Sequence, residues 1–262
     1  MRHFMLEVIK AVVDTKCEFS HKKFRSWAWS DPSMLKILDE LRSDPEKFGE
    51  VIWSTRRKKV YRLQLPDGRI VAYKTGRTRS RFRYLFFHTP GLREMVNFRI
   101  FRNAFNIPLV QLLAGGEIQN GLIKRTAWII TRFAEDYVDG SALTTADSQT
   151  RKDFLAFNMP LIAKLHKAGC YHRAFRPYNI LMKRQKDGSL DWIWLDLASC
   201  YFYFLPTIFL RHFFLDDLIK FFQCFAPTPE ELQLAADLYV QGNPRIGLTA
   251  EMLAGRIRKK LK

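Results

Sequence analysis

Four residues, far apart in the chain, have side chains that could together hold a phosphorylated nucleotide and its metal ions. Lys74 ends the apolar stretch RIVAYK, and Glu94 follows it by 20 residues with a carboxylate that could pair with the ammonium. Asn179 and Asp196 offer amide and carboxylate oxygens, the ligands that the hard cation Mg²⁺ prefers. Phosphoryl transfer uses such a set, because there the protein mainly positions the reactants and neutralises charge.

The segment GCYHRAFRPYNILMK, residues 169–183, has the frame of a phosphotransferase catalytic loop. His172 and Arg173 are followed by Asn179 and an apolar strand, and we expect the first two to brace the loop rather than to react. Such loops carry an aspartate that accepts the proton of the attacking hydroxyl, and here Ala174 stands in its place. Every requirement of phosphoryl transfer except the proton acceptor therefore has a candidate residue.

The residue pattern predicts the elements that must position these side chains. Two β-rich runs in 59–74 are joined by the turn Pro66–Gly68, which predicts a hairpin that ends at the lysine. A helix is predicted over 89–108, opened by a proline and stopped before another. Two short strands are predicted around the turn 119–121, the second of which ends at residue 134.

Most of the remaining chain has helical periodicity. The predicted helices lie at 31–44 (with Asp31 or Ser33 as cap), 147–168, 207–224, 228–241 and 249–262. The order of elements predicts an α+β fold with two lobes and the chemistry near their junction. We expect an N-terminal extension with a helix at 1–50, a small sheet-rich lobe at 51–134 and a larger helical lobe at 135–262.

Composition favours a globular protein with an anionic partner. The chain has 262 residues, of which 47% are hydrophobic, and a formal net charge of +17. Nucleic acid, a phosphorylated substrate and an anionic membrane surface all fit such a field. Nucleic acid is disfavoured, because the chain lacks a recognition-helix motif, an aromatic ribonucleoprotein signature and a zinc site.

The sequence predicts a cytoplasmic protein with reduced thiols. Cys17, Cys170, Cys200 and Cys224 are scattered and form no Cys-x-x-Cys pair. The N-terminal stretch carries an acidic residue in its apolar part and lacks a small-residue cleavage site. The apolar run 200–210 is far shorter than the roughly 20 residues of a spanning helix.

Taken together, the motifs occur in the order and at the separations found in kinases. RIVAYK is similar to the Val-Ala-Ile-Lys strand of kinases, and LHKAGCYHRAFRPYNILM, residues 165–182, is the most specific segment. On these residues the chain resembles the bacterial lipopolysaccharide core kinases, small kinase-like enzymes that phosphorylate heptose or Kdo sugars of the inner core. The resemblance runs from about residue 50 to 241 and includes RHFFLDDLIKFF, residues 211–222.

The resemblance implies a protein-kinase-like fold that binds ATP and Mg²⁺. Lys74, held by Glu94, would contact the nucleotide phosphates, and the backbone near Thr131, Arg132 and Phe133 would hold adenine. The acceptor would be an anionic glycolipid or sugar, specifically a hydroxyl of the lipopolysaccharide inner core, heptose before Kdo.

The resemblance also assigns roles in the second half of the chain. Asn179 and Asp196 would be the metal ligands. Asp217 matches the aspartate of an Arg-x-x-x-x-Lys-Asp-Leu segment in that family and would brace the catalytic loop, whereas Asp216 replaces the lysine.

The chain departs from kinase patterns at several positions. STRRKK, residues 54–59, stands where a glycine-rich loop is expected, and Leu197 and Ala198 replace the Phe-Gly that follows the metal aspartate. The absence of an Ala-Pro-Glu segment disfavours a protein substrate. Ala174 leaves three alternatives: an active-type kinase with its aspartate deliberately removed, a natural nucleotide-binding pseudokinase, or a different carboxylate as base. We favour a kinase with this single lesion, slowed by roughly 10²-fold or more, over a pseudokinase scaffold or a kinase of another small molecule.

Three further segments suggest contacts with anions or membranes. Alternate arginines in 77–87 form either a solvated loop or a docking surface for acidic sugars, phosphates or lipid headgroups. The C-terminal helix, 251–262, sets Leu253, Ile257 and Leu261 on one face, which could lie on an anionic bilayer or dock on the protein. The aromatic segment 201–225 is expected to be core rather than membrane anchor.

Overall fold

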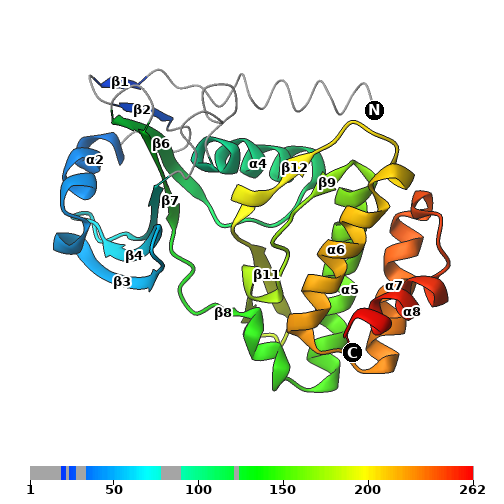
Figure 1. Ribbon diagram of the computed structural model, residues 1–262. Coiled ribbons are helices and arrows are strands. Elements are labelled where there is room, and N and C mark those ends of the chain that lie inside the picture. The colour runs from blue at the N-terminus through cyan, green and yellow to red at the C-terminus, as the bar shows by residue number, and fades with distance from the viewer. Residues whose placement is uncertain (1–18, 22–23, 28–33, 78–89, 121–123, 262) are drawn as a thin grey trace. The chain divides into compact units, whose positions relative to one another are not determined.

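The computed structural model describes residues 19–21, 24–27, 34–77, 90–120 and 124–261. They form two compact units (Figure 1). The unit that we call the sheet unit holds the described residues up to Phe101 together with Leu109–Glu135. The helical unit holds Arg102–Pro108 and the chain from Asp136 onward. The predicted mixture of strands in the first half and helices in the second is confirmed.

The sheet unit is built on one antiparallel sheet with the strand order β1-β2-β6-β7-β5-β4-β3. Its strands are β1 (Phe19–His21), β2 (Phe24–Trp27), β3 (Gly49–Ser54), β4 (Lys58–Gln64), β5 (Ile70–Arg77), β6 (Leu112–Asn120) and β7 (Lys124–Arg132). The predicted hairpin at 59–74 is confirmed as β4 and β5, which pair from Lys58↔Gly76 to Gln64↔Ile70. The prediction of four strands was incomplete, because β1, β2 and β3 also join the sheet.

Among the described residues, two α-helices and the 3-10 turn η1 (Pro45–Phe48) accompany this sheet. Leu38 and Leu41 of α2 (Met34–Ser43) belong to the hydrophobic core that also contains Tyr61, Tyr73 and Trp128 of the strands. The predicted caps of α2 lie outside the described residues. The helix α4 (Pro90–Phe105) confirms the helix predicted at 89–108. It lies so close to β6 that a Cβ on Gly115 would come within 2.5 Å of the Met95 sulfur.

The helical unit contains four long helices and two small sheets. The helices are α5 (Ser148–Lys167), α6 (Thr207–Phe225), α7 (Pro229–Gly242) and α8 (Ala250–Leu261). One sheet has the order β11-β10-β8, from Leu190–Trp194, Ile180–Arg184 and Val138–Asp139; the other pairs β12 (Tyr201–Phe202) with β9 (Cys170–Tyr171). Short 3-10 turns complete the unit: η2 (Gly140–Thr144), η3 (Pro177–Asn179), η4 (Leu197–Ser199) and η5 (Pro244–Ile246).

The core of the helical unit is aromatic. Phe154 of α5 stacks on Phe221 and Phe225 of α6, with ring centroids 5.8 and 5.7 Å apart. Phe175 stacks on the same Phe221 at 5.1 Å and lies 5.1 Å from Trp194. Phe175 belongs to the catalytic-loop segment, so its packing in this core anchors the loop to the helical unit.

A buried ion pair joins three of these helices. Arg151 of α5 donates to both carboxylate oxygens of Glu231, at 2.7 and 2.8 Å. Its guanidinium also donates to the carbonyl oxygens of Leu143 and Ala226 and lies over the Phe225 ring. Glu231 forms a capping box with the first residue before α7. The pair therefore ties α5 to the end of α6 and the start of α7.

The segments with predicted membrane or anion contacts have different outcomes. In α8, Leu253 and Ile257 are buried, and the helix packs on α6 and α7. The hypothesis that this apolar face lies on a bilayer is therefore wrong, and the docked alternative is confirmed. Residues 78–87 of the arginine-rich segment lie outside the described residues. No described helix combines the length and the apolar composition that crossing a bilayer requires.

Candidate active site

Lys74 and Glu94 form the predicted contact within the sheet unit. The Lys74 Nζ lies 3.1 Å from Oε1 and 3.2 Å from Oε2 of Glu94. The Lys74 side chain is 21% exposed, whereas that of Glu94 is only 6% exposed. The mostly buried Glu94 carboxylate thus pairs with a lysine whose side chain still reaches solvent. An anion that enters the site can therefore contact the Lys74 ammonium as well.

The segment predicted to hold adenine ends β7. Thr131 pairs with strands on both of its sides. The amide nitrogen of Arg132 donates to the Gln111 carbonyl oxygen at 2.8 Å, and that of Phe133 donates to the Ile70 carbonyl oxygen at 3.0 Å. These two donors are already used in the sheet. Adenine binding at 130–134 therefore stays a prediction that depends on the other backbone groups of the segment.

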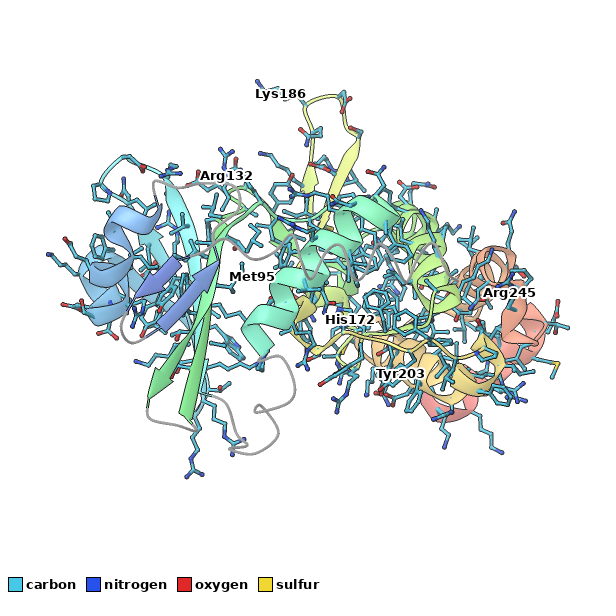
Figure 2. All side chains as sticks on the ribbon, turned by 90° about the horizontal axis from the view of Figure 1, so that it is seen from above. Met95, Arg132, His172, Lys186, Tyr203 and Arg245 are labelled. Atoms are coloured by element: carbon cyan, nitrogen blue, oxygen red, sulfur yellow. The ribbon has the colours of Figure 1, made fainter. Side chains whose placement is uncertain are left out.

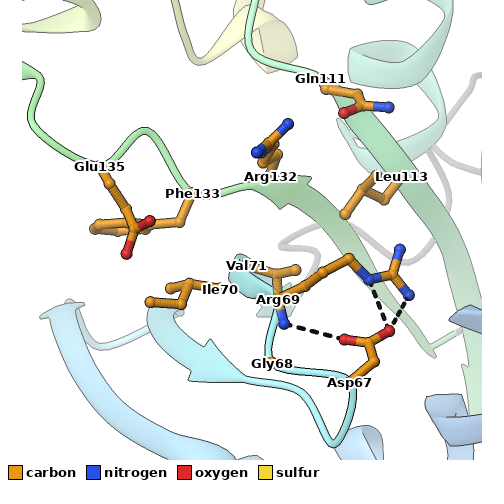
Figure 3. A pocket seen from close by; sticks show the side chains of 10 residues that line it. All are labelled: Asp67, Gly68, Arg69, Ile70, Val71, Gln111, Leu113, Arg132, Phe133 and Glu135. Atoms are coloured by element: carbon orange, nitrogen blue, oxygen red, sulfur yellow. Dashed lines mark hydrogen bonds and ion pairs between the residues drawn. The ribbon is translucent and has the colours of Figure 1, made fainter.

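A pocket of about 520 Å³ opens at the β4–β5 turn of the sheet unit (Figure 3). It is lined by Asp67, Gly68, Arg69, Ile70, Val71, Gln111, Leu113, Arg132, Phe133 and Glu135. Arg69 donates there to Asp67, with Nε 2.7 Å from the carboxylate oxygen, so this cation is partly neutralised. Lys74 does not line the pocket, which is therefore not the expected phosphate site.

The catalytic-loop segment is held at both ends. Gly169 ends α5 with a φ of +85°, and a Cβ there would come within 2.1 Å of the Tyr203 carbonyl oxygen. Only glycine fits this close approach, which explains its place in the loop motif. His172 follows β9 and is buried at 4% exposure (labelled with Tyr203 in Figure 2). Its ring packs edge-on against Phe175, in keeping with the expected bracing role.

Arg173 and Asp196 both have left-handed backbone, with φ of +68° and +53°. Such conformations are costly for residues with a Cβ and cluster at functional sites. The Arg173 guanidinium lies over the Tyr201 ring at 5.3 Å. Asp196 precedes the turn η4 but its side chain makes no capping hydrogen bond there. The role of helix cap, the ordinary alternative for this aspartate, therefore does not apply.

Asn179 closes the loop through the backbone of Ala174. Its side-chain Nδ2 donates to the Ala174 carbonyl oxygen at 3.1 Å. Its backbone carbonyl oxygen accepts from the Leu195 backbone amide at 2.8 Å. The second bond places Asn179 opposite the residue before Asp196, at the open end of the β10–β11 hairpin, as the spacing predicted. Because the amide nitrogen is engaged, the amide oxygen is the atom that remains for a ligand.

The donor set at this hairpin end fits Mg²⁺. One carboxylate and one amide oxygen are hard oxygen donors, and Mg²⁺ is often held by one or two protein carboxylates plus substrate phosphates. No group of three or more histidine, cysteine or acidic residues that could hold a metal ion by itself is present in the part of the chain that the structure describes. Asn179 and Asp196 therefore suit a metal that arrives with a nucleotide.

Asp217 braces the loop from α6. It is completely buried, and its Oδ2 accepts the backbone N–H of His172 at 2.7 Å. The Nε2 of His166 lies 3.6 Å from the same oxygen, while Nδ1 of that ring lies 2.8 Å from the Tyr239 hydroxyl. Burial lowers the pKa of His166, so the imidazole is neutral. It contacts the Asp217 carboxylate as a polar group rather than as a cation. The predicted contact of Asp217 with the loop backbone is present.

Asp216, the neighbour of this aspartate, faces a different network. Its Oδ2 accepts from the Tyr171 hydroxyl at 2.6 Å and from the Lys220 ammonium. Lys220 also donates to the Arg173 carbonyl oxygen at 3.1 Å. Desolvation opposes ionisation of Asp216, but the hydrogen bonds from Lys220 and Tyr171 outweigh it and lower the pKa of this carboxyl. A carboxylate so stabilised is a weak base, which disfavours it as a substitute proton acceptor.

Two positioning residues were missed from the sequence. His166 lies in the quoted motif, and its spacing from His172 was the signal that could have pointed to it. Lys220 gave no signal, because a lysine on an amphipathic helix is ordinarily solvated.

The chain is similar in sequence and in structure to known proteins. The profile of the lipopolysaccharide kinase (Kdo/WaaP) family matches residues 54–203, which is more than half of the chain. A solved structure described as WaaP in complex with acyl carrier protein is similar at a TM-score of 0.66 and 14% identity, with 90% of this chain and 98% of that chain covered. At this identity the likeness establishes the fold. Among curated proteins, no match was found. The chain belongs to the lipopolysaccharide kinase (Kdo/WaaP) family and has its kinase-like fold.

Proposed function

We propose that the protein transfers the γ-phosphoryl group of ATP to a sugar hydroxyl of the lipopolysaccharide inner core, heptose before Kdo, and that Ala174 slows this reaction. The observation that carries the proposal is the bond from Asn179 to the Ala174 carbonyl oxygen. It keeps the loop closed without using the side chain at position 174.

Each retained residue has a part in this proposal. Lys74, oriented by Glu94, would bind the phosphate oxygens of ATP, and Asn179 and Asp196 would hold Mg²⁺, which neutralises the phosphate charge. Asp217 would keep the His172 backbone, and through it the loop, in place. The acceptor hydroxyl has no carboxylate at position 174 to take its proton, so the proton would pass to water or to a carboxylate elsewhere in the site.

The choice of acceptor rests on family membership and on charge. The net charge of +17 suits an anionic glycolipid or sugar, whereas no described residue distinguishes heptose from Kdo. We place the protein in the cytoplasm, where ATP is available. A nucleotide-binding pseudokinase scaffold and a kinase of another small molecule are the competing functions.

The test compares Ala174→Asp with Ala174→Asn, which adds a side chain of the same size without a proton-accepting carboxylate. With labelled ATP and dephosphorylated lipopolysaccharide core, the aspartate variant should transfer phosphate at least about 10²-fold faster than the chain as written. The asparagine variant should show no such gain. Mg-ATP binding by all three proteins without transfer by any of them would identify a pseudokinase, whereas equal transfer before and after the change would mean that a different carboxylate is the base. Transfer only to a different small molecule would refute the proposed acceptor.

A further inference from the structure

Four large apolar side chains lie exposed around the start of α6, and we call them the 204–209 patch. Phe204 and Leu205 are 42% and 56% exposed, and Ile208 and Phe209 are 54% and 67% exposed. The aromatic segment 201–225 was expected to be core, and this is correct for Leu210, Phe214 and the buried residues that follow on α6. It is wrong for the patch. Four large exposed apolar side chains within six residues of chain are typical of an interaction site.

The backbone explains why these four residues face outward together. Pro206 precedes the first turn of α6 and makes no side-chain cap. Within that turn, Thr207 and Leu210 are buried, so the helical period directs Ile208 and Phe209 away from the core. Phe204 and Leu205 come from the extended chain just before the helix. The patch therefore combines a loop and a helix turn. Rotating the helix would not bury all four side chains, because two of them lie in the loop.

The chain that contains the patch and the turn beside it carry positive charge. Between Asp196 and Asp216 the sequence has no acidic residue, and it includes Arg211 one turn after the patch. The turn η5 packs on α6, and its Arg245 is exposed. The next residue but one, Gly247, is so placed that a Cβ on it would lie 3.8 Å from Cδ1 of Ile208.

We propose that the 204–209 patch inserts into the interfacial region of an anionic phospholipid bilayer, with Arg211 and Arg245 against the lipid headgroups. Apolar side chains rimmed by cations are the chemistry that binds such a surface, since burial of the apolar groups and attraction to anionic lipid add together. An acidic soluble protein would match the same arginines, but the proposed acceptor is a glycolipid, which is anchored in a bilayer. The charge pattern together with this acceptor therefore favours the bilayer.

Docking at this patch would bring the catalytic loop to the membrane. The patch begins two residues after β12, and β12 pairs with β9 through Tyr201↔Tyr171 and Phe202↔Cys170. His172 is the residue after β9. The inference rests on the proposed function for its biological role, because an acceptor anchored in a bilayer must be reached at the membrane surface. Membrane binding itself requires neither ATP nor catalysis.

The test is co-flotation of the full chain with lipid vesicles in the absence of nucleotide. Vesicles of phosphatidylcholine mixed with phosphatidylglycerol should carry the protein upward, and pure phosphatidylcholine should carry less. The double variant Ile208→Asn, Phe209→Asn should bind the anionic vesicles about tenfold more weakly. The matched control is Ile52→Asn, Trp53→Asn, because these residues of β3 are also about half exposed, at 46% and 49%. That control should float like the unmodified protein.

A second pair of variants tests the charge. Arg245→Gln should weaken binding to anionic vesicles severalfold, because each basic residue near such a surface strengthens binding. Lys186→Gln, in the β10–β11 turn far from Arg245 within the helical unit (Figure 2), should have no effect. Absence of flotation, or equal flotation of patch and control variants, would overturn the inference and leave the kinase proposal standing. Loss of a soluble protein partner in the patch variant, without any vesicle binding, would also overturn it.

Discussion

Replacement of Asp217 by alanine should destabilise the protein far more than the same replacement of its neighbour Asp216. Asp217 is completely buried and accepts the His172 N–H at 2.7 Å, so its removal leaves a buried donor without a partner. An orphaned donor of this kind costs about 1–3 kcal/mol, and the cavity left by the carboxylate adds to it. The Oδ1 atom of Asp217 has no hydrogen-bond partner among the described residues, so truncation also recovers part of the desolvation cost.

Together these contributions lower the free energy of unfolding by about 3 kcal/mol, at the lower end of the range for breaking a buried charged contact. For a chain of 262 residues this corresponds to a fall in the unfolding midpoint of about 5–6 °C. Asp216→Ala removes a side chain that is 42% exposed and accepts from Lys220 and from the Tyr171 hydroxyl, which should cost about 1 kcal/mol. Calorimetry of both variants, which needs no enzymatic activity, measures the difference. Equal midpoints for the two variants would refute the bracing role of Asp217.

Three further predictions follow from the site and the core. Lys74→Ala should weaken Mg-ATP binding about 10–100-fold by calorimetric titration, while the exposed Lys47→Ala should not; equal affinities would remove Lys74 from the phosphate site. Asp196→Ala should abolish the Mg²⁺ dependence of nucleotide binding, and an unchanged dependence would mean that the metal is held elsewhere. The hydrogen bond from Arg151 holds the pKa of Glu231 below its ordinary 4.5, so this pair stabilises the fold above that pH and the contribution disappears as the pH falls through the lowered value. The midpoint difference between the protein and Glu231→Gln should therefore shrink between pH 5 and pH 3, about the range in which carboxylates titrate, and a constant difference would contradict the role of the ion pair.

The elements that the sequence predicted are those with a strong local pattern. Hairpin β4–β5 and the helices α4 to α8 have turn residues, caps or periodic apolar positions that act over a few residues. Strand β3 lacked such a signal, because all six of its residues are exposed at the sheet edge and no alternation arises. Strands β9 and β12 have two residues each and exist through pairing across about 30 positions of chain. Local propensity carries no information about such long-range pairing.

The same division holds for the candidate site. The contact of Lys74 with Glu94 and that of Asp217 with the loop were predicted, since motif order specifies them. The bond from Lys220 to the Arg173 carbonyl spans 47 residues and ends on a backbone atom, which no side-chain pattern encodes. The exposure of Phe209 was also unpredictable, because it depends on where Pro206 sets the phase of α6.

The bond that closes the catalytic loop has a consequence for heredity. Asn179 donates to the peptide carbonyl of residue 174, an atom that every amino acid supplies. The loop geometry is therefore indifferent to the side chain at that position, and codons for alanine and aspartate can differ by a single base. A lineage with this loop could lose its proton acceptor by one point mutation and recover it by the reverse mutation, with no other residue needing to change. Under the proposed function, position 174 is a place where one point mutation can slow catalysis in one generation and a reverse mutation can restore it in a later one.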